Sequence, residues 1–482
     1  MANTLVVVVV IVYLLCMLGI GYYSSKKIQS NEDFMVAGRR LGPILMAGTL
    51  AATEIGGGSS LGVVEKAYGE WGISASWYVI TMGIAFMILA LIAPKFRASE
   101  VKTVPEYFRR RYGKTSGILT AIIMILPLIG LTASQFIASA TIVSVMLGLE
   151  FKIAVTIVAV VVTVYAVMGG LWAVTLTDFV QVFLIVVGMI LAVPFASKLA
   201  GGFGQIKTNV PPETWNMFRG IGPSTIISLI IMYIASFTVG QEAVSRYYAA
   251  RDGKAALQGS VIAAVINFIY AFIPTILGIA TLALINMGKI DGEIILKNGP
   301  KFALPTLAIT AMPAIIVGLL FAGIISATMS SADSDLLGAG SIFGNDIYKI
   351  YIKKDASAEQ VMRVTQITMI GIGFLAWIIA FNNTGNIINL LMFSFTLRAA
   401  GSFFPYIFGL YWEKASEAGT IASLILGSVV VVLLEHTPFT VGVDFLKDNP
   451  ILLGLAVSLV SFLIFTKLMP TKRTDCDLDP EA

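Results

Sequence analysis

The chain has 482 residues, of which 57% are hydrophobic and 12% are charged, and its formal net charge is +4. A soluble globular fold could not bury so much apolar surface, so this composition excludes one. The small positive charge gives no reason to expect nucleic-acid binding. The composition therefore predicts an integral membrane protein whose surroundings are the lipid bilayer.

Apolar segments of about 20 residues, the length that crosses a bilayer as a helix, recur along the whole chain. They are much longer than the alternating segments of a membrane β-barrel, so the fold class is all-α and polytopic. We expect about thirteen transmembrane helices, at residues 4–23, 41–63, 73–96, 116–147, 151–169, 171–200, 221–249, 258–286, 306–340, 361–382, 386–410, 416–434 and 450–468.

The distribution of positive charge predicts the orientation. Lys26 and Lys27 directly follow the first apolar segment, which places that end in the cytoplasm and the N-terminus outside. With thirteen spans, 22 of the 32 Lys and Arg residues fall on the cytoplasmic side, nine fall outside, and Arg398 lies within a span. This bias follows the positive-inside rule. We expect a multi-pass plasma-membrane protein with a cytoplasmic C-terminus.

Nothing in the sequence is typical of an enzyme or of a transition-metal protein. Cys16 and Cys476 fall on opposite sides of the expected topology, so no disulfide is expected. The single histidine, His436, lies at an outer helix end. No loop is long enough for a separate catalytic or sensor domain. We therefore expect a transporter with no catalytic residues and no obligate protein partner.

Residues 323–335 form a polar stretch inside the ninth apolar segment. Ser330, Ser331 and Ser334 share one helical face, Asp333 lies about 60° around the helix from Ser330, and Asp335 lies on the far flank. Acids at membrane depth are costly and usually mark an ion or substrate path. Hydroxyl and carboxylate oxygens suit a hard cation that has left water. The alternative, serine packing between helices, does not account for two acids.

Two other segments are interrupted. The second contains Gly56, Gly57 and Gly58, each of which destabilises a helix by about 1 kcal/mol, and the seventh contains the polar stretch 236–246. Paired broken helices in corresponding positions point to inverted repeats around a binding site at the midplane. We expect a single transporter domain with repeats at 41–200 and 221–410, an extra helix and loop at 1–40, and two C-terminal helices and a short tail at 411–482.

With these features the chain resembles the sodium:solute symporter family over nearly its whole length. The motifs that carry the resemblance are residues 33–39, 104–108, 111–113, 169–181, Gln241 with Arg246, 326–334 and 345–348. Residues 52–58 and 329–334 are most similar to high-affinity choline transporters. The resemblance implies a five-plus-five inverted-repeat (LeuT-like) core with flanking helices, and alternating access driven by Na⁺.

The resemblance also implies ion sites. The common Na⁺ site would use backbone carbonyls of Ala52, Ile55 and Ala327 and the hydroxyls of Ser330 and Ser331. A second Na⁺ site, present in some members, would use Asp178, Ser330, Asp333 and Ser334. Because two neighbouring acids repel each other when both are ionised, this pair needs either a bound Na⁺ or a shared proton.

Substrate recognition departs from the choline branch. Choline transporters bind the quaternary amine with tryptophans, whereas this chain has Glu54, Leu131 and Gly240 at the matching positions. Choline is therefore not expected. Proline transporters of the family also carry an acid at the position of Glu54. The expected substrate-binding residues are Glu54, Gly56, Gly57, Gly58, Gln241 and Arg398.

Glu54 and Arg398 are opposite charges inside the membrane. They are either a structural ion pair or the contacts of a zwitterion, with Glu54 facing its ammonium and Arg398 its carboxylate. We expect a Na⁺-coupled symporter that imports a small polar organic solute, amino-acid-like or amine-containing, with Na⁺ as the coupling ion. The alternative is a Na⁺- or H⁺-coupled carboxylate transporter in which Arg398 holds the carboxylate.

Overall fold

The computed structural model describes residues 4–25, 36–218, 220–382, 386–436 and 449–470. These residues are helical apart from short connections, which confirms the all-α fold class. The helices are α1 (Thr4–Ser25), η1 (Ala37–Arg39), α3 (Pro43–Glu54), η2 (Gly58–Gly62), α4 (Val63–Tyr68), η3 (Gly72–Ala75), α5 (Ser76–Ala98), α6 (Val104–Tyr112), α7 (Lys114–Leu147), α8 (Phe151–Ala200), α9 (Phe203–Thr208), η4 (Pro212–Trp215), α10 (Pro223–Val239), α11 (Gln241–Ala249), α12 (Gly253–Tyr270), α13 (Phe272–Asn286), α14 (Glu293–Asn298), η5 (Pro300–Phe302), α15 (Ala303–Ala311), α16 (Ala314–Ile342), η6 (Phe343–Ile352), α17 (Ala358–Asn382), α18 (Ile387–Tyr411), α19 (Glu417–His436) and α21 (Pro450–Leu468).

Ten helical segments of the described chain are long and apolar enough to cross a membrane. An eleventh is the bent pair α10 and α11, whose axes differ by 56° at Gly240. Two of the ten, Phe151–Met168 and Thr177–Ala200, lie within α8. The remaining two expected spans correspond to α1 and to the broken helix α3–α4, so the total of thirteen stays a prediction.

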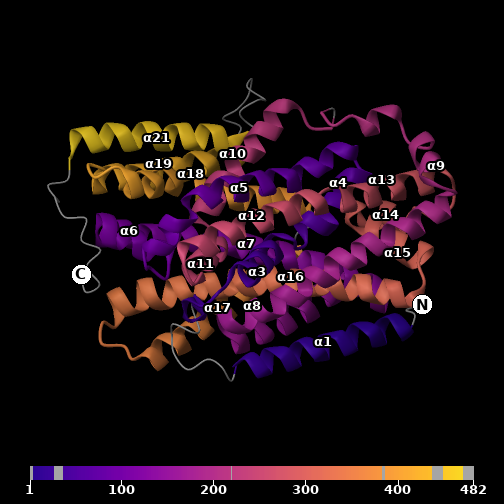
Figure 1. The fold of residues 1–482 in the computed structure, drawn as a ribbon, viewed down its shortest axis with the longest axis horizontal. Coiled ribbons are helices and arrows are strands. Elements are labelled where there is room, and N and C mark those ends of the chain that lie inside the picture. Colours follow the sequence, from indigo (N-terminus) through magenta and orange to yellow (C-terminus); the bar gives the residue numbers. More distant parts are fainter. Residues whose placement is uncertain (1–3, 26–35, 219, 383–385, 437–448, 471–482) are drawn as a thin grey trace.

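Most helices run along the long axis of the molecule, and α16 occupies its centre (Figure 1). Helix α16 packs against α8, α7 and α1. Every residue of α16 from Leu320 to Ile342 is buried, including the serines and acids of the polar stretch. Because these groups are buried away from water, their polar atoms depend on partners within the protein.

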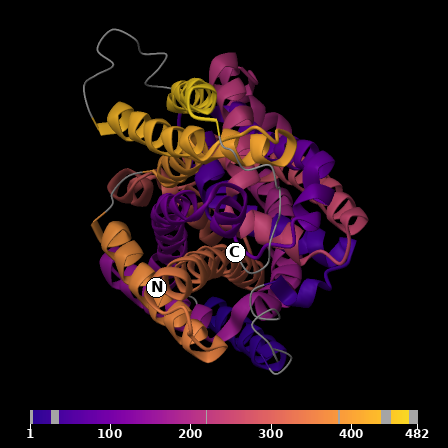
Figure 2. The same cartoon turned by 90° about the vertical axis from the view of Figure 1, so that its left-hand side faces the viewer.

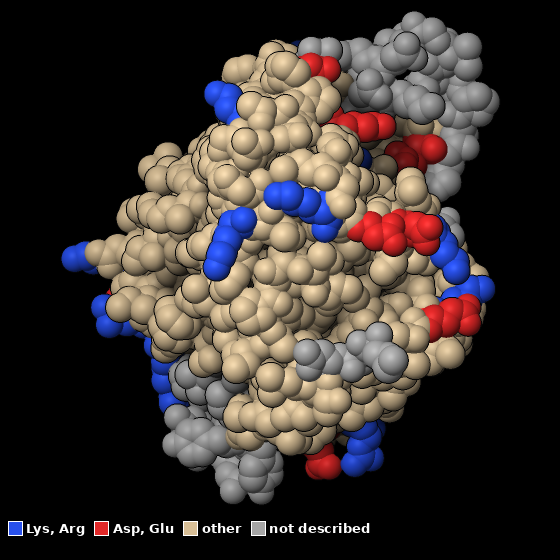
Figure 3. Space-filling view, turned by 90° about the vertical axis from the view of Figure 1, so that its right-hand side faces the viewer, with Lys and Arg blue, Asp and Glu red and all other residues tan. Residues whose placement is uncertain are grey.

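The first and last described helices run in the same direction. Helix α1 begins at the right-hand end of Figure 1, and α21 ends at the left-hand end. Figure 2 looks onto the left-hand end and Figure 3 onto the right-hand end, where acidic and basic side chains are both scattered over a largely uncharged surface. This arrangement agrees with an odd number of spans.

Candidate functional site

The glycine run ends helix α3 in the middle of the bundle. Ile55 follows the last helical residue with φ −82° and ψ 67°, and the chain resumes as the π-helical turn η2. The N–H of Gly57 donates to Oε1 of Gln135 on α7, at 2.8 Å. A Cβ atom on Gly57 would lie 2.5 Å from the Cβ of Ala138. Glycine is therefore needed for the break to sit directly against α7.

Ser331 on α16 faces the carbonyl groups that this break exposes. Its Oγ lies 3.0 Å from the carbonyl oxygen of Thr53, 3.1 Å from that of Ala327 and 3.5 Å from that of Ala52. The structure thus brings together three of the residues expected at the common Na⁺ site. A hydroxyl and several carbonyl oxygens at the end of a helix form the kind of oxygen cage that binds Na⁺ in transporters.

The other two expected members of the common site are Ile55 and Ser330, and only Ile55 lies at the helix break. Ile55 is the residue at the break itself, and its N–H donates to the carbonyl of Ala51 at 2.8 Å. Ser330 is one residue from Ser331, but its Oγ donates to Asp178 on α8. In this conformation, Ser330 therefore serves the expected second site rather than the carbonyl cage.

Asp178 is fully buried and has three partners. Thr49 and Ser330 both donate their hydroxyls to its carboxylate, and Nη2 of Arg246 lies 3.5 Å from Oδ2. From the sequence, a bound Na⁺ or a shared proton is the expected compensation for the pair Asp178 and Asp333. The structure places Arg246 of α11 beside Asp178 in that role, whereas the sequence indicated this arginine only as part of a family motif.

Arg246 connects the second-site residues to the bent span. Its Nη2 donates to Oγ of Ser334 at 2.6 Å, and its Nη1 donates to the carbonyl of Glu242 at 2.5 Å. Asp333, the remaining expected ligand, is buried, and its Oδ1 has no hydrogen-bond partner among the described residues. Asp178 and Asp333 therefore differ: a guanidinium compensates the first, whereas none does so for the second among the described residues.

Arg398 on α18 pairs with Glu242. Its Nη1 lies 2.5 Å from Oε1 of that residue, and its Nε donates to Oγ of Ser236 at 2.6 Å. A Cβ on Gly240 would lie 2.6 Å from Nη2 of Arg398, so the glycine at the bend makes room for the guanidinium. The structural ion pair considered between Glu54 and Arg398 is thus not the pair that forms. Glu242 takes that place because the bend turns its side chain toward α18.

Gln241 is not positioned as a solute contact. Its Nε2 donates to the carbonyl of Lys102 at 3.1 Å, and its Oε1 accepts from the N–H of Val104 at 2.9 Å. Both ends of the amide are therefore used to tie α11 to the start of α6. This placement differs from the expectation that Gln241 binds substrate.

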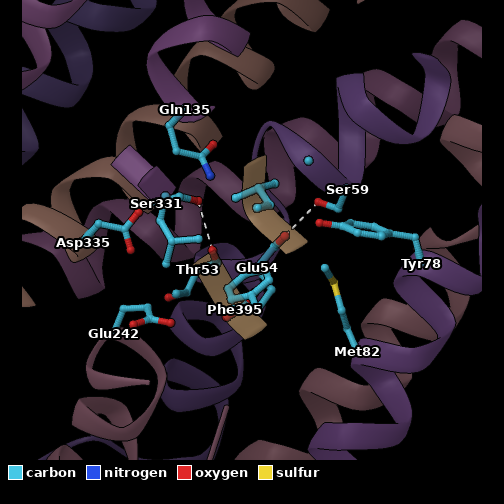
Figure 4. A pocket seen from close by; sticks show the side chains of 13 residues that line it. Thr53, Glu54, Ser59, Tyr78, Met82, Gln135, Glu242, Ser331, Asp335 and Phe395 are labelled. Atoms are coloured by element: carbon cyan, nitrogen blue, oxygen red, sulfur yellow. Dashed lines mark hydrogen bonds between the residues drawn. The ribbon is translucent and has the colours of Figure 1, made fainter. Parts of the chain in front are cut away.

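A small polar cavity lies beside the break, between α3, α5, α7, α11, α16 and α18. Its volume is about 20 Å³, which is room for about one water molecule, so the site is nearly closed in this structure. Three carboxylates line it, those of Glu54, Glu242 and Asp335. Figure 4 shows Glu242 and Asp335 on one side of Glu54, with Tyr78 and Met82 on the other. The other lining residues are Thr53, Gly58, Ser59, Leu131, Gln135, Ser331, Leu391 and Phe395.

Several of these residues were missed as site residues. Gln135 is a polar side chain in an apolar span, which is itself a sign of function at membrane depth. Asp335 was expected only as an intramembrane acid and not as a site residue. Glu242 was not expected at the site, although its neighbour Gln241 was. Gly56, Gly57 and Arg398, which were expected to bind substrate, adjoin the cavity through their neighbours and do not line it.

A broken helix and a bent helix that meet at a polar cavity in the bundle centre are characteristic of secondary transporters with inverted repeats. The sequence model of the sodium:solute symporter family matches residues 34–427, and the chain belongs to this family. Among curated proteins, it is 26% identical over 477 residues to the osmoregulated proline transporter OpuE of Bacillus subtilis, covering 96% of this chain and 94% of that protein. It is 27% identical over 463 residues to the high-affinity proline transporter PutP of the same organism, covering 92% and 94%.

Solved structures show the same fold. A Na⁺-coupled sialic acid symporter in a substrate-bound outward-open state superposes with a TM-score of 0.81 at 22% identity, covering 98% of this chain and 99% of that one. The nucleobase-cation-symport transporter Mhp1 superposes with a TM-score of 0.57 at 13% identity, covering 92% and 96%. These likenesses confirm the expected LeuT-like architecture.

Family membership confirms the main functional expectations. The chain is a multi-pass membrane transporter that couples Na⁺ to the uptake of a small organic solute, and it is not an enzyme. It binds both Na⁺ and its solute within the membrane.

Proposed function

We propose that the solute carries an ammonium group, which Glu54 and Asp335 bind in the central cavity. The observation behind this proposal is the charge of the lining: three carboxylates face the cavity, and the neighbouring Arg398 pairs with one of them. Two carboxylates are thus left without an ion pair among the described residues. Buried carboxylates are costly unless they are paired or protonated, so the cavity favours a positive charge.

The relatives support an amino-acid-like solute. The two Bacillus subtilis proteins are described as proline transporters, and proline combines an ammonium with a carboxylate. Tyr78, Met82, Leu391 and Phe395 supply the apolar wall that a small ring or short aliphatic chain would contact. Arg398 is held by Glu242 in this conformation, so a purely anionic solute would have to displace a carboxylate at 2.5 Å. This competition disfavours the carboxylate alternative.

For sodium, the proposal keeps the common site of Ala52, Ile55, Ala327, Ser330 and Ser331, with Ser331 and the carbonyls as its principal ligands. The second site of Asp178, Ser330, Asp333 and Ser334 requires Arg246 to leave Asp178, since the guanidinium occupies the position of a cation. In the conformation described, the second site is therefore closed by an arginine. The two repeats, at 41–200 and 221–410, supply these ligands from both halves.

For localisation, the proposal is the plasma membrane, with the N-terminus outside and the C-terminus in the cytoplasm. The charge distribution of the sequence and the shared direction of α1 and α21 support this orientation.

A ligand panel tests the solute class. Purified protein in Na⁺ is heated with one of three compounds. Proline has both charged groups, pyrrolidine has the ammonium alone, and cyclopentanecarboxylate has the carboxylate alone. A ligand that binds the folded state raises the melting temperature, so proline and pyrrolidine should raise it and cyclopentanecarboxylate should not. Stabilisation by the carboxylate alone would contradict the proposal. In the Glu54→Gln variant the response to the amines should weaken, whereas the exposed control Glu293→Gln should behave as wild type.

The alternative coupling ion is H⁺, and the buried acids are the observation that favours it. Proteoliposome uptake is measured with an inward Na⁺ gradient at equal pH, and with an inward H⁺ gradient in K⁺. Uptake in the first condition and none in the second is expected. Equal uptake in both would instead show that protons replace Na⁺.

A further inference from the structure

A second polar cavity lies far from the central one, beside α6, the helix labelled near the left-hand end of Figure 1. Its volume is about 430 Å³, and it lies between α6 with the start of α7 on one side and η6 with the turn after it on the other. The lining residues are Lys102, Glu106, Arg109, Arg110, Lys114, Asn345, Asp346, Lys349, Ile350 and Lys354. Six cationic side chains thus face two carboxylates, a formal excess of four positive charges.

The two carboxylates are already engaged by the walls of the cavity. Oε1 of Glu106 lies 2.5 Å from Nη2 of Arg110, and its Oε2 accepts from the N–H of Lys102 at 2.7 Å. Asp346 accepts from Oγ1 of Thr103, also at 2.7 Å. The acids therefore help to build the cavity, and no salt bridge to its four lysines, Lys102, Lys114, Lys349 and Lys354, occurs among the described residues.

The positive-inside rule accounts for basic residues at this end but not for their arrangement. The cations come from two segments, 102–114 and 349–354, which are more than 200 residues apart in sequence and converge on one concavity. Arg110 and Glu106 are mostly buried, with exposed side-chain fractions of 14% and 13%. Ile352 and Tyr351, at the end of η6, add exposed apolar surface next to it. Cations that are only solvated on a flat surface would show neither feature.

We propose that this cavity binds a phosphate group. Multiple Lys and Arg side chains in a partly enclosed site are the chemistry that recognises phosphate oxygens. Two sources have this chemistry, the headgroup of an anionic phospholipid and a free phosphate or pyrophosphate. Basic pockets between helices on the cytoplasmic side of a membrane protein suit lipid headgroups, and the adjacent apolar residues suit the lipid source.

The position of the cavity connects it to the transport site. Helix α16, which carries Ser330 and Ser331, continues without a break into η6. The other wall, α6, is held to the bent span through the hydrogen bonds of Gln241 with Lys102 and Val104. A phosphate between α6 and η6 therefore binds the ends of two elements that both lead to the central cavity. Its occupancy should favour the conformation in which these ends are close together.

The test uses the full-length protein purified in a neutral detergent, and the melting temperature is measured during two titrations. One titrates sodium pyrophosphate against sodium chloride of equal ionic strength, and the other titrates short-chain phosphatidylglycerol against phosphatidylcholine. The variant Lys349→Gln with Lys354→Gln removes two cavity cations that lie at the rim. The control, Lys207→Gln with Lys297→Gln, makes the same change in net charge on α9 and α14, where both lysines are exposed.

Wild type and control should be stabilised by at least one of the two phosphate sources, and the rim variant should need about tenfold more of it. A response to phosphatidylglycerol alone supports a lipid site, and a response to pyrophosphate alone supports a soluble ligand. The proposal is overturned if neither source stabilises wild type. It is also overturned if the control loses the response as much as the rim variant, because the attraction would then be non-specific.

Discussion

At the scale of single residues, four buried acids near the centre of this transporter fall into two groups. Asp178 and Glu242 each have an arginine partner, Arg246 and Arg398 respectively. Glu54 and Asp335 line the cavity, and no salt bridge to either occurs among the described residues. The compensated acids hold helices together, and the uncompensated ones are available for a cationic ligand. The division follows from the bend at Gly240, which places Glu242 beside Arg398 and Arg246 beside Asp178.

Ser331→Ala tests the carbonyl cage. The change removes a hydroxyl that lies within 3.5 Å of three carbonyl oxygens. We expect the Na⁺ concentration for half-maximal uptake to rise about tenfold, which corresponds to about 1.4 kcal/mol. Uptake by proteoliposomes at varied Na⁺ measures it, and Ser341→Ala, a buried serine farther along α16, is the control. An unchanged Na⁺ dependence would place the ion elsewhere.

The pair Asp178 and Arg246 should show strong energetic coupling. Removing one partner of a buried pair leaves an uncompensated charge and costs about 3–5 kcal/mol. Asp178→Asn and Arg246→Gln should therefore each lower stability, and the double variant should lose less than the sum. Unfolding in Na⁺-free detergent solution measures the three free energies, so that no ion contributes to them. Additive losses would show that the two residues do not form a pair in the protein.

At the scale of elements, the break between α3 and η2 depends on close approach to α7 and α18. A Cβ on Gly57 would lie 2.5 Å from the Cβ of Ala138, which cannot move without its helix. A Cβ on Gly58 would lie 2.3 Å from Cδ1 of Leu391, which is the far end of a flexible side chain. A side chain at position 57 would thus meet a rigid neighbour, Ala138, whereas one at position 58 would meet the movable side chain of Leu391.

Gly57→Ala should consequently destabilise the protein more than Gly58→Ala does. Overpacking in a rigid site costs about 1–3 kcal/mol, and a rotamer change of Leu391 avoids part of it. Gly371→Ala in α17, where a Cβ would meet nothing within 4 Å, should cause no loss. Melting temperatures of the three purified variants give the comparison. If Gly58→Ala lowered the melting temperature more than Gly57→Ala, the expectation that Leu391 moves more easily than Ala138 would be wrong.

At the scale of the whole molecule, orientation is the property most directly open to experiment. In a background without Cys16 and Cys476, Thr208→Cys and Asp355→Cys place single thiols at exposed positions on opposite ends of the bundle. A membrane-impermeant maleimide should label Thr208→Cys in intact cells and Asp355→Cys after permeabilisation alone. Permeabilised cells, in which both should react, are the control for thiol accessibility. The reverse pattern would invert the proposed topology.

The sequence by itself determined the membrane class, the helical fold and the family, because each rests on a property that repeats along the chain. Long apolar segments specify spanning helices whatever their neighbours are. The glycines at 56–58 and the polar residues 236–246 and 323–335 marked the three interrupted or polar spans, and the structure brings all three to one place. Ser331 lies against the carbonyls of Ala52 and Ala327, where the resemblance implied it.

Only the tertiary structure decided which charges are partners. Glu54, Glu242, Asp335, Asp178, Arg246 and Arg398 come from five helices, and in the sequence any acid could pair with either arginine. The 56° bend between α10 and α11 selects Glu242 for Arg398 and brings Arg246 to Asp178. Ion pairing inside a membrane depends on contacts of a few ångströms between helices distant in sequence, and the pattern of residues along one helix carries no information about that distance.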